Sequence, residues 1–539
     1  MANTFPGRPA TALLVVVFLI LLVRFIPFLD IHDPWIDEAM LLANFPLATI
    51  SGLFEPLPYF EQGGALGYIA LLNFVALSFP DQPVLPFRIL SVIASLVGAG
   101  LILAAVRRLA SGPVVVLALA FACLTPFIVR YSLEIKPYIF EYLATALVMH
   151  ASTYLLSGTD VKRFSYFLGA SIFAIVFSFT APIAIGAFGI GVMAHRWFRD
   201  TGETRIKGML YILAALSLTA VIFLVYYFGY TRPVTAIQFS AHAYIYDAYH
   251  LTYPPQTEDA IKRWFMLPYL FVFQLDLFPQ HIYAKYQFIE LKWIVYAAIA
   301  LFFVAGVISA ARISLFVVAS FISAIFLIFG LSLIGLLPIG FVRHFTFMLP
   351  LTAIVAAFGV AVCFHWSFGW VTPKIAPACI ILGLSAIGIS GYHKASNLER
   401  EALSPLITHI VESDGFDTPV WVFYSAQPAM RILAPKSLVQ TGLVDHKSSI
   451  AGWSSKQKNA SRNAIGEQYY EQFAQSIRNY SEIWLVFSHM WLEPDLARFM
   501  VIAKQEVGGC REVMTAQDSH LWRCGQTQKQ NIQSDKAQR

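Results

Sequence analysis

Acidic side chains are concentrated in the polar stretch that follows the first apolar run. The sequence DIHDPWIDEA contains Asp30, His32, Asp33, Asp37 and Glu38. Carboxylates beside a membrane are expensive to bring near lipid unless they carry chemistry or face water. A histidine among several carboxylates can also bind a metal ion, although this spacing matches no specific ligand motif. The run is therefore either a functional loop or an acidic loop exposed to water.

A second charged group lies in the short polar segment RYSLEIKPY, residues Arg130–Tyr138. Glu134 and Lys136 stand between two apolar runs, and Glu141 follows seven residues after Glu134. On one continuous helix, that spacing places both glutamates on the same face, with Glu141 one or two turns deeper. A buried carboxylate needs a partner, and Lys136 or Arg130 is within reach. The alternative is ordinary snorkelling of interfacial charge.

Arg343 and His344 form a third group, at the start of a late apolar run. A guanidinium group grips phosphate through two parallel hydrogen bonds, so the pair is a candidate phosphate clamp. Taken alone, the pair is more typical of an interfacial anchor.

The composition indicates which elements must position these groups. Of the 539 residues, 58% are hydrophobic and only 13% are charged, and the mean hydropathy is +0.64. A soluble domain of this size needs far more charge to cover its surface. The net charge of +5 does not indicate a nucleic-acid partner, because the basic residues lie in short segments between apolar runs. The sequence therefore predicts a multi-pass membrane protein.

The apolar runs predict about eleven membrane-spanning helices, each of roughly 16–22 residues. The run Leu66–Phe79 is short and contains Asn73, so we expect an interfacial helix there; Trp264–Phe278 is also of borderline length. The expected spans are Thr11–Asp30, Pro86–Val106, Pro113–Val129, Tyr138–Leu156, Phe164–Thr180, Ala181–His195, Met209–Tyr230, Trp293–Ala310, Ser314–Leu337, Phe345–Phe364 and Ile375–Ser390.

Positive charge predicts the orientation of these spans, with a cytoplasmic N-terminus. The opposite side receives the loop 31–85, the turn 130–137, the loop 231–292 and the C-terminus. The basic residues that fall on the cytoplasmic side are Arg8, Arg107, Arg108, Lys162, Arg163, Arg196, Arg199, Arg205, Lys207, Arg312 and Lys374.

The composition changes after about Gly391, so we expect a catalytic membrane domain over 1–391, a small α/β domain over 392–526 and a polar tail over 527–539. Buried strands are predicted at Pro419–Tyr424 and Glu482–Phe487. Cys510 and Cys524 bracket a predicted hairpin at its open end. In an oxidising compartment they are expected to form a disulfide, the alternative being two free thiols.

In this order the three charged groups resemble the membrane-embedded glycosyltransferases of the GT-C superfamily, especially the protein O-mannosyltransferase and lipid A aminoarabinose transferase group. Asp37-Glu38 matches the acidic pair of the first outer loop. Pro56–Leu66 matches the Pro-rich stretch after that pair, and Arg88 matches the arginine that opens the next span. Tyr131–Tyr138 (YSLEIKPY) matches the second outer loop, and Arg343-His344 before Phe345 matches the basic residue that opens a late span. Gly63-Gly64 stand where two prolines are frequent.

The resemblance implies a fold, a reaction and roles for these residues. The fold is polytopic and α-helical, GT-C-like, with the small α/β domain on the periplasmic side. Asp37 acts as base and Glu38 orients it or the acceptor. Arg343 and His344, with Lys136 or Arg88, hold the donor phosphate. Glu134 and Glu141 serve as second-loop acids that ligate a divalent cation (Mg, Mn or Zn) or pair with these basic residues.

The predicted activity is transfer of a hexose or pentose from a polyprenyl-phosphate carrier to a hydroxyl of a glycan, lipopolysaccharide (lipid A) or protein, at the periplasmic face of a bacterial inner membrane. Partners are thus the lipid-linked donor, the envelope acceptor and the bilayer. A transporter or flippase predicts charges in the middle of spans and paired repeats, which the sequence lacks. A membrane anchor leaves the acidic loop without a purpose. A ligase or polymerase of lipid-linked glycans remains the alternative enzyme.

Overall fold

The computed structural model describes residues 9–25, 33–60, 62–80, 84–110, 112–158, 160–241, 289–339, 342–367, 402–414, 417–438, 440–441, 467–488 and 493–525, with single residues at 250, 251, 253, 255 and 383. The chain packs as two compact units. The helical unit comprises Met1–Asp30, Thr49–Glu55 and Gly64–Ala395, and the α/β unit comprises Ile31–Ala48, Pro56–Gly63 and Ser396–Arg539. Several parts of the chain named in the sequence analysis lie outside the described residues: Asp30, His32, the run 264–278, the run 375–390 except for residue 383, and the tail 527–539.

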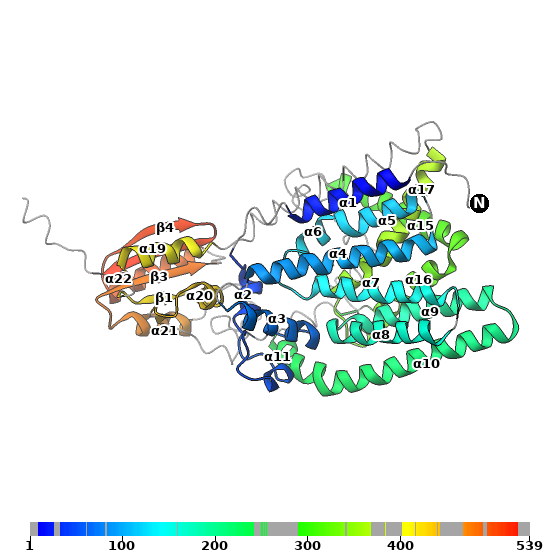
Figure 1. Ribbon diagram of the computed structural model, residues 1–539. Helices are drawn as coiled ribbons and strands as arrows, with labels where there is room; N and C mark the ends of the chain where they lie inside the picture. The colour runs from blue at the N-terminus through cyan, green and yellow to red at the C-terminus, as the bar shows by residue number, and fades with distance from the viewer. Residues whose placement is uncertain are drawn as a thin grey trace, which may run out of the picture. The chain divides into compact units, whose positions relative to one another are not determined.

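The helical unit consists of helices that lie lengthwise beside one another (Figure 1). Helix α7 is its centre, because α4, α8, α9 and the short helix η4 all pack against it. The helices are α1 (Pro9–Phe25), α3 (Leu66–Ser78), α4 (Val84–Leu109), α5 (Pro113–Leu124), α6 (Pro126–Tyr131), α7 (Tyr138–Leu155), α8 (Val161–Phe177), α9 (Ala181–Arg199), α10 (Gly202–Tyr226), α11 (Arg232–Ala241), α15 (Ile289–Ile313), α16 (Leu315–Leu333) and α17 (Leu349–Ser367), with the short helices η2 (Ser51–Phe54), η3 (Tyr227–Thr231) and η4 (Val342–Met348).

The local sequence explains where these helices begin and end. Pro113 and Pro126 open α5 and α6, at the position where a missing backbone N–H does no harm. Asp160 caps α8 by accepting a hydrogen bond from the Arg163 backbone N–H at 3.0 Å. The last turn of α4 contains Arg107 and Arg108. Their positive charge is favourable there, because the C-terminal end of a helix dipole is negative.

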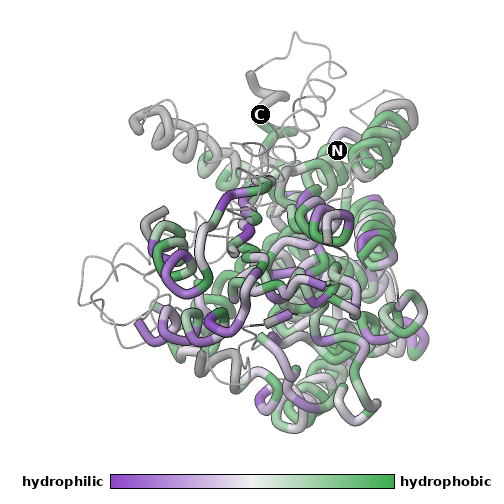
Figure 2. The backbone as a smooth tube through the Cα atoms, turned by 90° about the vertical axis from the view of Figure 1, so that its left-hand side faces the viewer, coloured by the Kyte–Doolittle hydropathy of each residue, from purple (hydrophilic) through white to green (hydrophobic). Residues whose placement is uncertain are grey.

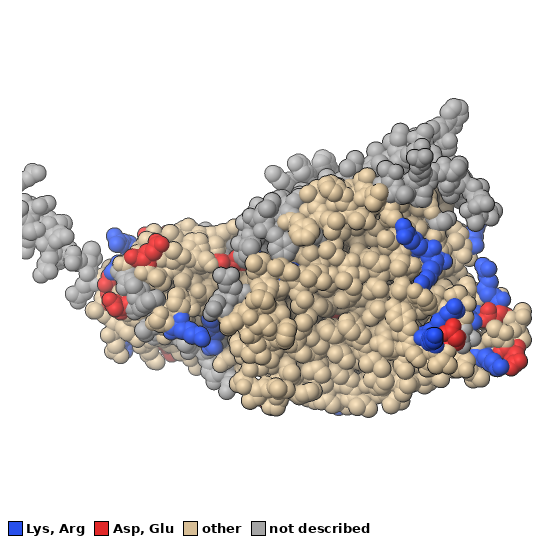
Figure 3. Space-filling view, viewed as in Figure 1, with Lys and Arg blue, Asp and Glu red and all other residues tan. Residues whose placement is uncertain are grey.

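Apolar surface on the outer helices of this unit is suited to lipid. On α10, Leu210, Leu218 and Val225 are 60%, 44% and 69% exposed, whereas α7 is buried along most of its length. Apolar residues dominate the helices in Figure 2, and on the face shown in Figure 3 the visible charged side chains of this unit gather at one end, beside a broad uncharged band. An exposed apolar band bounded by charge is the surface that a bilayer requires.

Four helices of the described chain are long and apolar enough to cross a membrane: Val84–Leu109, Gly202–Ala236, Leu315–Leu333 and His344–Val362. Shorter apolar helices accompany them, including Leu66–Ser78, which has 13 residues and therefore about 20 Å of length. The protein is thus a multi-pass membrane protein. The total of about eleven crossings and their orientation stay predictions.

The α/β unit contains a five-stranded sheet in the order β2-β1-β3-β5-β4. Strands β2 and β3 pair parallel with β1, and β5 pairs antiparallel with β3 and β4. Its elements are α2 (Ile36–Leu42), α19 (Ser404–Asp414), β1 (Val420–Val422), α20 (Gln427–Leu433), β2 (Gln440–Thr441), α21 (Glu467–Ile477), β3 (Glu482–Ser488), α22 (Glu493–Glu506), β4 (Cys510–Ala516) and β5 (Ser519–Gly525).

Both faces of the sheet are covered, which explains why its central strands are continuously apolar. Trp421 of β1 and Leu485 of β3 face one core, which includes residues of α21 and α22. Val422 and Trp484 point to the other core, which includes residues of α19 and α20. Cys510 and Cys524 face each other across the β4–β5 hairpin and form a disulfide.

Candidate active site

Helix α2 carries the acidic pair of the first polar stretch. Asp37 is half-buried and Glu38 is only 2% exposed. The Trp35 backbone N–H donates to the Glu38 carboxylate at 3.3 Å, so Glu38 closes the first turn of the helix on itself. Both carboxylates lie in that first turn, where the positive end of the helix dipole stabilises negative charge. The sequence places these acids on a short, capped helix that fixes the spacing between them.

The second charged group lies in the turn between α6 and α7, residues 132–137, which we call the Glu134 turn. Arg130 Nε and Glu134 Oε1 are 2.6 Å apart, and the Glu134 side chain is 12% exposed. Lys136 is 8% exposed. Tyr131 and Tyr138 meet edge to face across the turn, with ring centroids 4.9 Å apart. Two cations and one carboxylate are therefore held in a small, largely buried segment.

The Glu134 turn is joined to the start of α4, which carries Arg88. Ser91 Oγ donates to the Glu134 backbone carbonyl at 3.4 Å. Residues three apart on a helix share a face, so Arg88 and Ser91 lie on neighbouring positions of the same face of α4. The structure thus places the half-buried Arg88 one turn from a contact with the Glu134 turn.

The expectation that Glu134 and Glu141 share one helix face is wrong. Helix α7 begins at Tyr138, so Glu134 precedes it and the two glutamates do not share a helix face. The short, Pro-containing turn breaks the helical register between them. Glu141 is 7% exposed and accepts a hydrogen bond from Thr180, which immediately precedes α9. Its Oε2 atom has no hydrogen-bond partner among the described residues.

The Arg343-His344 pair lies in η4, which packs against α7 and α17. His344 is half-buried, whereas the neighbouring Phe345 and Phe347 are fully buried. The side chain of Arg343 lies outside the described residues. The short helix η4 continues directly into α17, and together they contain the apolar span His344–Val362, which agrees with the expected span Phe345–Phe364. Buried aromatic residues hold this basic segment against α7.

The described residues do not provide a metal site. No group of three or more His, Cys, Asp or Glu side chains with suitable spacing occurs in that part of the chain. Glu134, one of the two expected ligands, pairs instead with Arg130, whose Nε lies 2.6 Å from Glu134 Oε1. The donor set around the Glu134 turn therefore fits anionic ligands better than a divalent cation.

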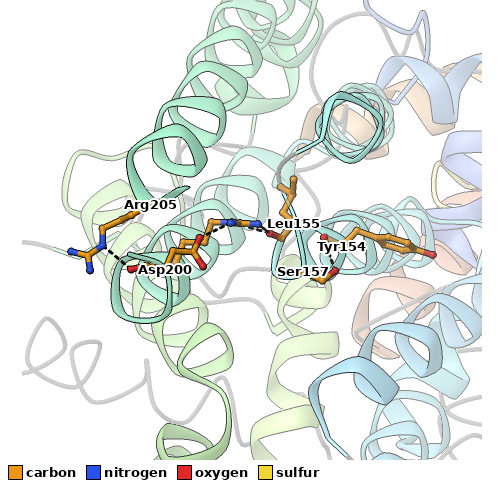
Figure 4. Close-up of polar contacts among 6 residues, drawn as sticks. Tyr154, Leu155, Ser157, Asp200 and Arg205 are labelled. Atoms are coloured by element: carbon orange, nitrogen blue, oxygen red, sulfur yellow. Dashed lines mark hydrogen bonds and ion pairs between the residues drawn. The ribbon is translucent and has the colours of Figure 1, made fainter. Parts of the chain in front are cut away.

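The opposite end of α7 also contains charge, which the sequence did not single out as buried. Arg196, 3% exposed, donates from Nε to the Leu155 carbonyl at 2.9 Å and pairs through Nη1 with Asp200 at 2.6 Å. Arg205 Nε donates to the Asp200 carbonyl at 2.9 Å (Figure 4). A cation that satisfies the last carbonyls of a helix is a capping group, so this cluster is structural.

Known proteins resemble this chain in structure rather than in sequence. No protein-family profile matches the sequence, and no curated protein does. Solved structures do match. ArnT from Cupriavidus metallidurans bound to undecaprenyl phosphate matches with a TM-score of 0.50 and 12% identity, over 95% of this chain and 97% of that one. The Archaeoglobus fulgidus oligosaccharyltransferase in its apo form matches with a TM-score of 0.53 and 11% identity, over 93% of this chain and 71% of that one.

Both neighbours are GT-C membrane glycosyltransferases, and the match to ArnT extends over nearly the whole of both chains. The chain has the GT-C fold. The resemblance drawn from Asp37-Glu38, the Glu134 turn and Arg343-His344 is therefore confirmed at the level of the fold. At this identity the match establishes the GT-C fold and leaves the roles of individual residues to be argued from this chain.

Within the helical unit, most of the predicted residues lie on elements that adjoin α7 or pack against it. Helix α4, the Glu134 turn, α7 and η4 pack around the Tyr138 end of α7 or directly on that helix. They carry Arg88, Glu134, Lys136, Glu141 and His344, and Arg130 lies near the end of the adjoining α6. Asp37 and Glu38 belong to the α/β unit instead. The helical unit thus carries the cationic candidates, and the α/β unit carries the two acids of α2.

Proposed function

We propose that this protein transfers a monosaccharide from a polyprenyl-phosphate carrier to a hydroxyl group of an envelope acceptor. The observation that carries the proposal is the cationic neighbourhood of Arg88 and Lys136 on a fold whose ArnT example was crystallised with undecaprenyl phosphate. A lipid phosphate needs positive charge at the edge of an apolar unit, and this neighbourhood offers it. We further propose a bacterial inner membrane as the location, with the site on the periplasmic face.

The acidic helix supplies the base in this proposal. The Asp37 carboxylate takes the proton of the acceptor hydroxyl while that oxygen forms a bond to the anomeric carbon. The bond between the anomeric carbon and the phosphate oxygen breaks, and the phosphate leaves with the electron pair. Attack from the side opposite the phosphate inverts the anomeric centre. Glu38, fixed by the Trp35 N–H, orients the acceptor or Asp37.

The cationic residues stabilise the leaving group. Lys136 and Arg88, with Arg343 and His344 of η4, are the groups proposed to hold the phosphate, since guanidinium and ammonium donors stabilise phosphate charge as it develops. Arg130 is held by Glu134 and serves to position the turn. A divalent cation, which the resemblance allows, does not fit the described carboxylates, so no step is assigned to it.

A second candidate is transfer of a whole oligosaccharide from its lipid carrier. It is supported by the match to the Archaeoglobus fulgidus oligosaccharyltransferase, which has the higher TM-score of the two neighbours. Both reactions need an activated acceptor and a held phosphate, so the site alone does not separate them. Mass spectrometry of the product and of the released carrier separates them, because the added mass is one sugar or several and the carrier is a mono- or a diphosphate.

The test of the proposed base is Asp37→Asn in full-length protein, assayed with radiolabelled polyprenyl-phosphate sugars and envelope acceptors. Loss of a positioned general base lowers the rate by roughly 10²–10⁴-fold. The matched control is Glu55→Gln, which removes an exposed carboxylate from the same stretch of chain. The control is expected to transfer at the wild-type rate. Full activity of the Asp37→Asn protein would remove Asp37 from the mechanism.

A further inference from the structure

The first polar stretch of the chain is built into the C-terminal domain. Ile31–Ala48 and Pro56–Gly63 pack with Ser396–Arg539 as one compact unit, although more than 330 residues separate them in sequence. Helix α2, which carries Asp37, packs on α20 of that unit. Three separate sets of contacts hold it there.

The first contact is a helix cap supplied from a distant segment. The Ser404 backbone N–H donates to Asp33 Oδ2 at 2.7 Å, and the Ser404 hydroxyl donates to Asp33 Oδ1 at 2.5 Å. Ser404 is the first residue of α19, so its N–H has no partner within that helix. A carboxylate at this position also meets the positive end of the helix dipole. Asp33 therefore caps α19 from four residues before Asp37.

The second contact is apolar. Ala39 is fully buried in the core formed by α19, α20 and one face of the sheet, together with Leu406, Met430 and Trp484. Residues two apart on a helix point about 200° away from each other, so Asp37 lies on the face of α2 opposite to Ala39. The face of α2 that is anchored in the domain is thus not the face that carries the acid.

The third contact fixes the end of α2. The Asn44 side chain accepts from the Tyr59 N–H at 2.8 Å and donates to the Tyr59 carbonyl at 3.2 Å. The guanidinium of Arg431, in α20, lies 4.4 Å from the centre of the Tyr59 ring. Asn44 thus ties the two polar segments together, and the Arg431–Tyr59 cation–π contact ties them to the C-terminal domain.

We propose that the C-terminal α/β domain fixes the position of helix α2, which carries the proposed base. In this proposal Asp33 and Ser404 are positioning residues for Asp37. The proposal rests on the proposed function, since it concerns the placement of the proposed base. The domain holds α2 at its start through Asp33, along one face through Ala39 and at its end through Asn44. The remaining face presents Asp37 in a fixed direction. This gives the C-terminal domain a role in the chemistry without any residue of it touching the substrate.

The experiment compares Asp33→Ala, Asp33→Asn and Ser404→Ala in the full-length protein in nanodiscs. Amide hydrogen exchange in residues 35–44 reports the hold on α2 and does not require activity. Loss of a hydrogen-bonded carboxylate is expected to speed that exchange by about 10- to 100-fold in Asp33→Ala. Asp33→Asn keeps one acceptor oxygen and is expected to restore part of the protection. Exchange in β3 and β5 serves as the measure of intact folding.

The kinetic arm separates positioning from general damage. Asp33→Ala and Ser404→Ala are expected to lower kcat by about tenfold or more while leaving KM for the lipid donor unchanged, because the donor phosphate is held by the helical unit. The matched controls are Ser413→Ala, an exposed serine at the other end of α19, and Asp417→Asn, an exposed acid of the same domain. Neither is expected to change exchange or kcat.

Each possible result either supports the proposal or overturns it. Unchanged exchange of α2 in Asp33→Ala shows that the cap does not hold the helix, and overturns it. Faster exchange of α2 with a wild-type kcat overturns the positioning role. Should the wild-type protein transfer no sugar from any polyprenyl phosphate, the proposed function fails, while the exchange data still show whether the domain holds α2.

Discussion

The two ends of helix α7 both contain buried charge, but they satisfy it differently. At the Leu155 end, Arg196 is engaged by the Leu155 carbonyl and by Asp200, and Asp200 in turn accepts from Arg205. At the Tyr138 end, Glu141 is held by Thr180, and its second oxygen has no hydrogen-bond partner among the described residues. The same helix therefore ends in a completed polar network on one side and an incomplete one on the other.

The difference distinguishes ionisable side chains that stabilise the fold from ionisable side chains that can bind a ligand. A buried polar group without a partner costs stability, so each such group in a folded protein needs an explanation, and a role in binding or catalysis is one. A fully paired group such as Arg196 contributes to structure and leaves no capacity for substrate. From this comparison we expect substitutions at the Tyr138 end, with the Glu134 turn beside it, to affect the proposed transfer more than stability.

The largest expected effect is on stability, at the Leu155 end. Arg196→Ala leaves Asp200 without its partner and the last turn of α7 without its cap, which costs about 3 kcal/mol in the free energy of unfolding. The midpoint of thermal unfolding in nanodiscs measures the loss. Arg199→Ala, an exposed arginine one turn later on α9, is the matched control and is expected to leave the midpoint unchanged. Equal midpoints for the two variants would contradict the structural role of Arg196.

A smaller effect is expected from Lys136→Met, at the Glu134 turn. On the proposed role of Lys136 in holding the donor phosphate, we expect kcat/KM for the lipid donor to fall by roughly 10–100-fold, with a smaller change in thermal stability than Arg196→Ala gives. Lys136→Arg keeps the charge and is expected to retain part of the activity. The control is Lys207→Met, whose side chain is 62% exposed. Donor kinetics like those of the wild type would remove Lys136 from the phosphate site.

The smallest change in stability is expected at Glu141. Glu141→Gln keeps an acceptor for Thr180 and replaces a buried carboxyl group with a neutral amide of similar shape, so the free energy of unfolding changes by less than about 1 kcal/mol. The proposed transfer is expected to fall several-fold, because the variant replaces a titratable carboxyl group near the start of α7, next to the turn that carries Lys136. Glu203→Gln, 78% exposed, is the control. A loss of stability as large as that of Arg196→Ala would make Glu141 a structural group and abolish the contrast.

Much of the fold was accessible from local sequence patterns. Uninterrupted apolar runs predicted long helices such as α4 and α10, and continuous apolar strands predicted a sheet covered on both faces around Trp421 and Trp484. The acidic pair and the YSLEIKPY segment marked the candidate site because charge next to lipid needs a reason. These features depend on residues close together in the chain.

Contacts between residues that are distant in sequence could not be predicted from local sequence patterns. The hydrogen bonds between Asp33 and Ser404 join residues 371 apart in sequence, and no periodicity signals which serine an acid will meet. The expectation that Glu134 and Glu141 share a helix face failed because a turn at Pro137 resets the register. Arg196 was counted as a topological charge, since its burial depends on the packing of α9 against α7.

The shared core of the first polar stretch and the C-terminal domain has a consequence for biosynthesis. A ribosome adds about 5–20 residues per second, so roughly 20–70 s pass between synthesis of Asp33 and synthesis of Ser404. During that interval Ala39 has no core to enter and α19 does not yet exist. A chain released before Ser404 is made therefore lacks the domain on which its acidic helix packs, so we expect truncated or stalled products to lack the proposed activity.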